Sequence, residues 1–261
     1  MMSLDKIELS AVPETMLQTV YARASETKRG RGFINDLKAV EIVEALDYDF
    51  SKAEKDKTMA TGVIARTIVL DKLVKEYLDK HKNSVVLNLA CGLDTRAYRF
   101  DNYQTWYNLD LEETMKIRRH FFKETSKIKQ ISASAMDEKW TNEVEESEEA
   151  LVIIEGLSMY LNETDIKEIF RIIAKKFKQV TVFIEVMNPM VVKHIKEKSI
   201  GAKFNWGVKN GTELEKLIPN YQAVAEYSLC EGMKVFIPIY KFLSKLSFVS
   251  NISNKIIVLR K

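Results

Sequence analysis

The hydrophobic periodicity of this chain changes near residue 84, and this change constrains the fold more than any other feature. Before it, residues 14–80 carry apolar side chains three to four positions apart, which predicts helices. After it, short β-branched runs alternate with helical segments at 111–125 and 165–177. This alternation is typical of a parallel, doubly wound α/β sheet. The runs predict buried strands at residues 84–90, 105–110, 128–134, 150–156 and 180–187.

The alternation ends after Pro189. A basic, largely helical stretch follows, with the segment GAKFNWGVKNG inside it, and we expect it to form a lid insertion. Strand signals return at 222–229 and 254–260, and we expect the last strand to close an antiparallel hairpin at the sheet edge. These segments predict one domain over residues 1–261, made of a helical cap (1–82), an α/β core (83–187), the lid insertion (188–221) and C-terminal strands (222–261).

Composition disfavours several classes of protein. The 40 basic residues nearly balance the 37 acidic ones, which disfavours a general nucleic-acid binder. Two cysteines and three histidines do not make a disulfide framework or a zinc site, so we expect no metal and a reduced, cytoplasmic setting. No apolar run reaches the roughly 18 residues of a membrane span, and the start MMSLDKIELS lacks an export signal. We therefore expect no membrane partner.

Ligands of open α/β sheets bind beyond the carboxyl ends of the strands, so residues that follow strands are the site candidates. Gly92 follows the first strand and lets the backbone pass close to a ligand. Asp110 follows the second, 18 residues later, close to the roughly 20-residue spacing of an acid that binds ribose hydroxyls. Its alternative role is to cap the next helix. Glu155 follows the fourth strand and should meet either the ligand or an arginine of the helical cap.

Two other classes of enzyme fit the same residues less well. A nicotinamide dehydrogenase carries G-x-G-x-x-G after its first strand, whereas this turn has a single glycine, too few for a pyrophosphate. The run GLSMY nearly matches the G-x-S-x-G nucleophile elbow of an α/β-hydrolase, but Tyr160 occupies the position of the second glycine. The remaining triad members would have to be Glu185 and His194, which are unusually close in sequence. A nucleotide-like ligand without phosphate fits the turn best.

Four stretches in order along the chain carry a resemblance. They are ETMLQTVYARASETKRGRGFINDLKA, ATGVIARTIVLD, VVLNLACGLDTRAYRF and LVIIEGLSMYL. The third is similar to the pattern N-L-G-x-G-L-D-T-R-x-x-R, and the fourth to E-G-x-x-x-Y-L, of the leucine carboxyl methyltransferase and polyketide O-methyltransferase family. The similarity runs from about residue 14 to residue 211. It implies a Rossmann-like class I methyltransferase with a mostly parallel seven-stranded sheet, helices on both faces, and S-adenosylmethionine (SAM) as cofactor.

The resemblance also implies roles for single residues around SAM. Arg66 would bind the methionine carboxylate with its planar guanidinium. Gly92 would pass beneath the methionine, and Asp110 would bind the ribose. Glu155 would lie close to the methionine amino group and the sulfonium.

The chain departs from the family pattern beside these positions. Ala90 occupies a position where the family commonly has glycine, and Cys91 follows it; both are small, so we expect a tighter turn and an intact site. Ser134 and Ala135 would border the adenine, although Ser134 replaces an acid that is common there. We expect Cys91 to be a packing residue and not a reactive thiol.

The expected reaction is the in-line transfer of a methyl group from SAM to an oxygen of a small molecule or peptide. Glu155 and Tyr160 are the expected catalytic residues, and Tyr21, Tyr160, His194 and Trp206 are the expected walls of the acceptor site. A carboxylate acceptor needs no base, whereas a hydroxyl acceptor does. The few histidines favour a carboxylate, but both acceptors stay open, as does a SAM-binding sensor or partner protein without transferase activity. The sequence does not fix the oligomeric state.

Overall fold

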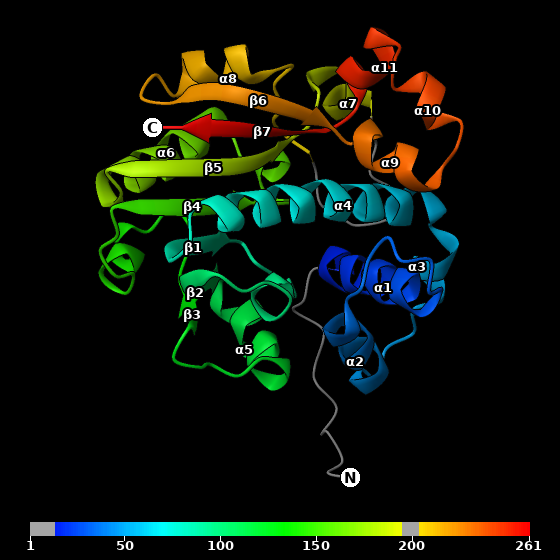
Figure 1. The fold of residues 1–261 in the computed structure, drawn as a ribbon, viewed down its shortest axis with the longest axis horizontal. Coiled ribbons are helices and arrows are strands. Elements are labelled where there is room, and N and C mark those ends of the chain that lie inside the picture. Colours follow the sequence, from blue (N-terminus) through cyan, green and yellow to red (C-terminus); the bar gives the residue numbers. More distant parts are fainter. Residues whose placement is uncertain (1–13, 195–203) are drawn as a thin grey trace.

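The computed structural model describes residues 14–194 and 204–261 of the 261-residue chain. Within these residues, seven strands form one sheet in the order β3-β2-β1-β4-β5-β7-β6 (Figure 1). Strands β1 to β5 run parallel, and β7 is antiparallel to both of its neighbours. The predicted fold class is therefore confirmed. The strands are β1 (Ser84–Leu89), β2 (Tyr103–Asp110), β3 (Ile128–Ser132), β4 (Glu149–Ile154), β5 (Gln179–Val186), β6 (Gln222–Ser228) and β7 (Lys255–Arg260).

The region predicted to be helical, residues 14–80, contains four helices, and the two helices predicted inside the core are α5 and α6. Asp56 caps α4 by accepting a hydrogen bond from the backbone of Met59, and Asn162 caps α6 in a capping box with Asp165. The helices are α1 (Glu14–Lys28), α2 (Leu37–Ala45), α3 (Ser51–Lys55), α4 (Lys57–Lys80), α5 (Glu112–Phe121), α6 (Glu163–Lys176), α7 (Pro189–His194), α8 (Gly211–Leu217), α9 (Cys230–Phe236), α10 (Tyr240–Leu243) and α11 (Ser247–Ile252), and the 3-10 helices are η2 (Arg96–Tyr98), η3 (Glu138–Asn142) and η4 (Ser158–Tyr160). None of the described helices is both long and apolar enough to cross a bilayer.

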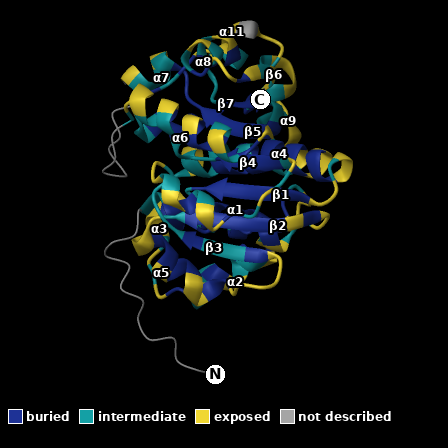
Figure 2. Ribbon diagram, turned by 90° about the vertical axis from the view of Figure 1, so that its left-hand side faces the viewer, coloured by how far each residue is buried: buried dark blue, intermediate teal, exposed yellow. Residues whose placement is uncertain are grey.

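Helices cover both faces of the sheet, which is why the central strands are apolar on both sides. In β1, Val85, Leu87 and Leu89 pack with α6 on one face, while Val86 packs with α4 on the other. Figure 2 shows the central strands buried between these helical layers. A parallel sheet of this kind holds the carboxyl ends of its strands rigidly along one edge.

The helical cap lies at that edge. Helix α1 packs against α2, α3 and α4, and Leu17, Ile42 and Phe121 join α1, α2 and α5 in a separate apolar cluster (Figure 1). The chain continues from β1 to β2 and β3, and then returns to place β4 on the other side of β1. The crevice between β1 and β4, where the strand order reverses, is the expected ligand position in such a sheet.

The predicted antiparallel pair at the sheet edge is confirmed. β6 and β7 form this pair, β7 lies between β5 and β6, and α9 to α11 connect the two strands in place of a tight turn. The order of these two strands follows from how far each is buried. β7 is buried along nearly its whole length, as a strand with neighbours on both sides must be, whereas β6 alternates between exposed and half-buried residues, as suits an edge.

The predicted lid insertion, residues 188–221, is described only in part. Helix α7, the segment 204–210 and helix α8 belong to it, and residues 195–203 lie outside the described residues. The backbone amides of Asn205 and Trp206 donate to the carbonyl of Met159, and that of Val208 donates to Met187. These bonds attach the second half of the insertion to the segments that follow β4 and β5.

Candidate active site

A cavity of about 650 Å³ lies at the carboxyl ends of β1, β2, β4 and β5, beneath α1 and the first turns of α4. Its volume lies within the range of roughly 300–1,000 Å³ that is usual for sites of small ligands. Arg66, Gly92, Asp110, Glu155 and Tyr160 line it, so the structure brings together five of the ten site residues predicted from the sequence.

Gly92 and Asp110 form the first contact between strand ends. Gly92 has a φ of 48°, in the left-handed region, and its amide donates to Asp110 Oδ2 at 2.7 Å. Asp110 Oδ1 accepts from the amide of Leu111 at 2.8 Å. Burial raises the pKa of the Asp110 carboxyl, although the hydrogen bond from Gly92 opposes the rise. Each carboxylate oxygen has a second lone pair, which leaves Asp110 able to accept from a ligand hydroxyl.

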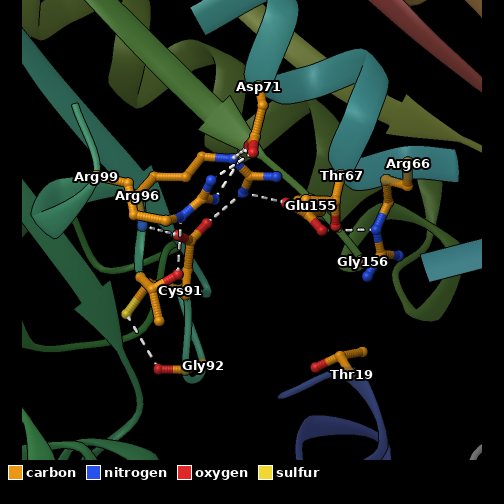
Figure 3. Close-up of polar contacts among 12 residues, drawn as sticks. Thr19, Arg66, Thr67, Asp71, Cys91, Gly92, Arg96, Arg99, Glu155 and Gly156 are labelled. Atoms are coloured by element: carbon orange, nitrogen blue, oxygen red, sulfur yellow. Dashed lines mark hydrogen bonds and ion pairs between the residues drawn. The ribbon is translucent and has the colours of Figure 1, made fainter. Parts of the chain in front are cut away.

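Glu155 lies at the end of β4 between two arginines (Figure 3). Its Oε1 is 2.6 Å from Arg66 Nε, and its Oε2 is 2.5 Å from Arg96 Nη1. Burial alone would raise the pKa of Glu155, but the charges of Arg96 and Arg66 outweigh it and lower the pKa. We expected Glu155 to meet either the ligand or an arginine of the cap. In the structure it pairs with the cap residue Arg66, and both residues line the cavity.

Glu185, near the end of β5, is a cavity residue that the sequence analysis did not assign to the cofactor site. It is 2% exposed, and its Oε2 is 2.9 Å from Arg66 Nη1 and accepts from the amide of Gly156 at 2.9 Å. The signal that could have found it is the one used for Glu155, an acid within an apolar strand. Such a carboxylate is costly to bury unless it is paired.

These groups belong to a larger arginine–carboxylate network. Asp71 of α4 binds both Arg96 and Arg99 (Figure 3), and Arg96 also contacts Asp94. Asp36 connects Arg99 to Arg23, so four arginines face five carboxylates and one excess negative charge remains beside the cavity. A cationic ligand group would balance it. The members are Arg23, Arg66, Arg96, Arg99, Asp36, Asp71, Asp94, Glu155 and Glu185.

The structure does not bring the four predicted acceptor-site residues together. Tyr160 lines the cavity, and its ring is 5.3 Å from that of Phe204. Tyr21 is not among the described residues that line the cavity; it stacks on Phe50 with ring centroids 4.9 Å apart. Trp206 is buried in the core cluster on the α6 face of the sheet. His194 ends α7, and its side chain lies outside the described part of the chain.

The two residues expected at the adenine lie next to the cavity and not in its described lining. Ser134 Oγ accepts from the amide of Met136, and the Ala135 carbonyl accepts from the indole of Trp140. The preceding Ala133 donates its amide to the Asp110 carbonyl at 3.0 Å. The loop after β3 therefore adjoins the Asp110 side of the cavity, and the contact with adenine stays a prediction.

The two departures from the family pattern have different consequences. Ala90 takes a φ of 51°, a left-handed conformation that favours glycine. Cys91 is buried, and its burial raises the pKa of the thiol to about 12, so the thiol stays protonated at neutral pH. The geometry agrees with Cys91 as a packing residue.

The cavity fits a SAM-like ligand on two further observations. The amide Nδ2 of Asn88 is buried at the cavity and has no hydrogen-bond partner among the residues that the structure describes. The second is the excess negative charge of the arginine–carboxylate network beside the cavity. A buried donor without a partner and an excess of negative charge suit a ligand that is polar and cationic. Fold and site together define a Rossmann-like enzyme with a nucleoside-type cofactor.

The comparisons with known proteins give the family. The leucine carboxyl methyltransferase family model matches residues 16–174. The tetracenomycin polyketide synthesis O-methyltransferase TcmP of Streptomyces glaucescens is 33% identical over 237 residues, 87% of each chain. The S-adenosyl-L-methionine-dependent methyltransferase dpfgK of Gibberella zeae is 25% identical over 241 residues, 82% of this chain and 81% of that protein. The chain belongs to the leucine carboxyl methyltransferase family and is a SAM-dependent methyltransferase.

Solved structures agree on the fold. A Thermobifida fusca crystal structure assigned as a methyltransferase matches with a TM-score of 0.62 at 12% identity, and 94% of both chains is covered. The magnesium protoporphyrin IX methyltransferase ChlM of Synechocystis, with bound S-adenosylhomocysteine (SAH), matches with a TM-score of 0.50 at 8% identity, covering 86% of this chain and 93% of that one. At these identities the likeness concerns the fold alone. The predicted family, enzyme class and cofactor are confirmed by the family and its relatives.

Proposed function

We propose that this chain transfers the methyl group of SAM to an acceptor with an apolar body. The oxygen that accepts the methyl group belongs to a carboxylate of this acceptor. The observation that carries the proposal is that the cavity is lined by two sets of residues, which we call the polar wall and the apolar wall. The polar wall contains Asp110 and the arginine–carboxylate network, and the apolar wall contains Met59, Met159 and Phe204. The relative TcmP is named an O-methyltransferase, which supports oxygen as the acceptor atom.

The polar wall holds the cofactor in this proposal. When bound, SAM supplies an electrophilic methyl group on a sulfonium cation. Asp110 accepts hydrogen bonds from the ribose hydroxyls, and Arg66 binds the methionine carboxylate. Glu155 lies beside Arg66 and keeps a negative charge, which favours a cation nearby. These residues therefore hold and orient the donor without taking up a proton.

The apolar wall orients the acceptor. Met16 comes from α1, Met59 and Val63 from α4, and Phe204 from the segment before α8. Apolar side chains of this kind remove water from the acceptor and hold it against the methyl group, which is the main contribution an enzyme makes to an in-line displacement. The phenol of Tyr160 adds a polar group next to Phe204 that can align the acceptor oxygen.

The lack of a histidine base among the described cavity residues favours a carboxylate acceptor. The pKa of Glu155 is lowered by Arg96 and Arg66, so this carboxylate is a weak base at neutral pH. A carboxylate acceptor is ionised already and needs no proton transfer.

The test is a screen for methyl transfer with isotopically labelled SAM. We expect SAH and a labelled ester from apolar carboxylic acids, and the label should be released by mild alkali because methyl esters hydrolyse and methyl ethers do not. Label that resists alkali would identify a phenol or alcohol and overturn the carboxylate. SAM binding without transfer to any acid, phenol or peptide would favour a SAM-binding sensor instead.

A further inference from the structure

Glu155 and Glu185 are held side by side by the register of two parallel strands. Ile154 of β4 pairs with Ile184 of β5, so the residues that follow them occupy equivalent positions at the carboxyl edge. Two carboxylates at neighbouring strand ends repel each other unless a cation lies between them. Arg66 reaches this place from α4 and contacts both.

The contacts of Arg66 are divided between the two acids. Its Nε is 2.6 Å from Glu155 and its Nη1 is 2.9 Å from Glu185, so the guanidinium is shared between the two acids. Nη1 donates to Glu185, whereas Nη2 and Nε make no hydrogen bond to the residues that the structure describes, although Nε is 2.6 Å from Glu155. Figure 3 shows the guanidinium beside Gly156 and across from Thr19, and both Arg66 and Thr19 line the cavity. This arrangement leaves one edge of the guanidinium for a ligand carboxylate.

Glu185 is the better anchored of the two acids. The Gly156 amide donates to its Oε2 at 2.9 Å, and the Asn254 side chain donates to its Oε1 at 3.5 Å. Gly156 has a φ of 67°, and a Cβ there would be 3.6 Å from Arg66 Nη1. Glu185 therefore joins α4, the loop after β4 and the segment before β7, and it is 2% exposed.

We propose that Glu185 is a positioning residue that acts through Arg66: with Glu155 it fixes the guanidinium so that its remaining edge binds the carboxylate of the amino-acid end of SAM. This inference rests on the proposed cofactor site. Glu185 would have no part in binding the adenosine end, which lies at Asp110. Its loss should therefore weaken only those ligands that carry the amino-acid carboxylate.

The experiment compares two ligands by isothermal titration, SAH and 5′-methylthioadenosine, which lacks the amino-acid carboxylate. For Glu185→Gln we expect the affinity for SAH to fall by about tenfold or more, as for a lost buried charge contact, and that for methylthioadenosine to stay within about twofold. The exposed Glu168→Gln of α6 is the matched control and should change neither affinity.

A double-mutant cycle separates positioning from a general effect on structure. In an Arg66→Ala background, Glu185→Gln should cause no further loss of SAH affinity, because the two side chains act as one unit. Equal losses for both ligands, or additive losses in the cycle, would overturn the inference. If Glu185→Gln does not fold, Glu185→Asp keeps the charge and shortens its reach, and the same selective loss is expected. Wild-type protein that binds neither compound would overturn the proposed cofactor site as well.

Discussion

The two walls of the cavity are built in different ways. In the polar wall, Asp110, Glu155 and Glu185 come from strand ends, and each is fixed by backbone amides or by arginines. In the apolar wall, Met16 and Met59 come from helices of the cap and are held by packing. Hydrogen bonds and ion pairs depend on distance and angle, whereas apolar packing tolerates changes of shape. Under the proposed function, the polar wall fixes the cofactor and the apolar wall determines which acceptor fits.

Removal of Arg66 should have the largest effect. Arg66→Ala leaves Glu155 and Glu185 adjacent without the cation between them, so we expect the free energy of unfolding to fall by roughly 3–5 kcal/mol. Denaturant unfolding measures this loss. The control is Arg171→Ala, whose exposed pairs with Glu138 and Glu168 should contribute little to stability because solvent screens them. Equal losses in the two variants would contradict a special role for the polar wall.

Removal of the Asp110 carboxylate should have the next largest effect. Asp110→Ala removes the acceptor for the ribose hydroxyls and should weaken SAM binding by about 1.5–3 kcal/mol. Titration calorimetry gives the affinity, and methylthioadenosine should lose as much as SAH because both contain the ribose. Unchanged SAM affinity would remove Asp110 from the site.

Substitution of Tyr160 tests whether the acceptor side of the cavity acts separately from the cofactor side. Tyr160→Phe keeps the ring beside Phe204 and removes the hydroxyl, so we expect kcat/KM for the acceptor to fall by roughly tenfold while the affinity for SAH is unchanged. Tyr21→Phe is the matched control, since Tyr21 packs on Phe50 and should leave both quantities unchanged. A parallel loss of SAH affinity in Tyr160→Phe would show that the two walls are not separate in function.

The smallest effect is expected at Ala90. Its φ of 51° is strained for any residue with a Cβ, so Ala90→Gly should raise the free energy of unfolding by about 0.5 kcal/mol after the entropy of glycine is subtracted. Ala60→Gly within α4 is the control and should lower stability by about 1 kcal/mol. If both variants lose stability alike, Ala90 is not strained.

Much of the polar wall could be predicted because its residues follow strands. Gly92, Asp110 and Glu155 were identified from their position after apolar runs, and a parallel sheet brings such positions to one edge. Glu185 was missed although it occupies the same kind of position. The walls of the acceptor site were predicted less well, since Tyr21 and Trp206 pack elsewhere. An aromatic residue has no periodic signal that separates a cavity wall from a core.

The sequence by itself determined the alternation of strands and helices, the carboxylates at the strand ends, and the resemblance to the methyltransferase family, because each depends on local spacing. Only the tertiary structure decided that Arg66 lies between Glu155 and Glu185, and that β7 inserts between β5 and β6. These contacts join residues far apart in the chain, such as the 119 positions between Arg66 and Glu185. The energy of such a pair depends on the register of neighbouring strands and on burial, which no local pattern in the sequence encodes.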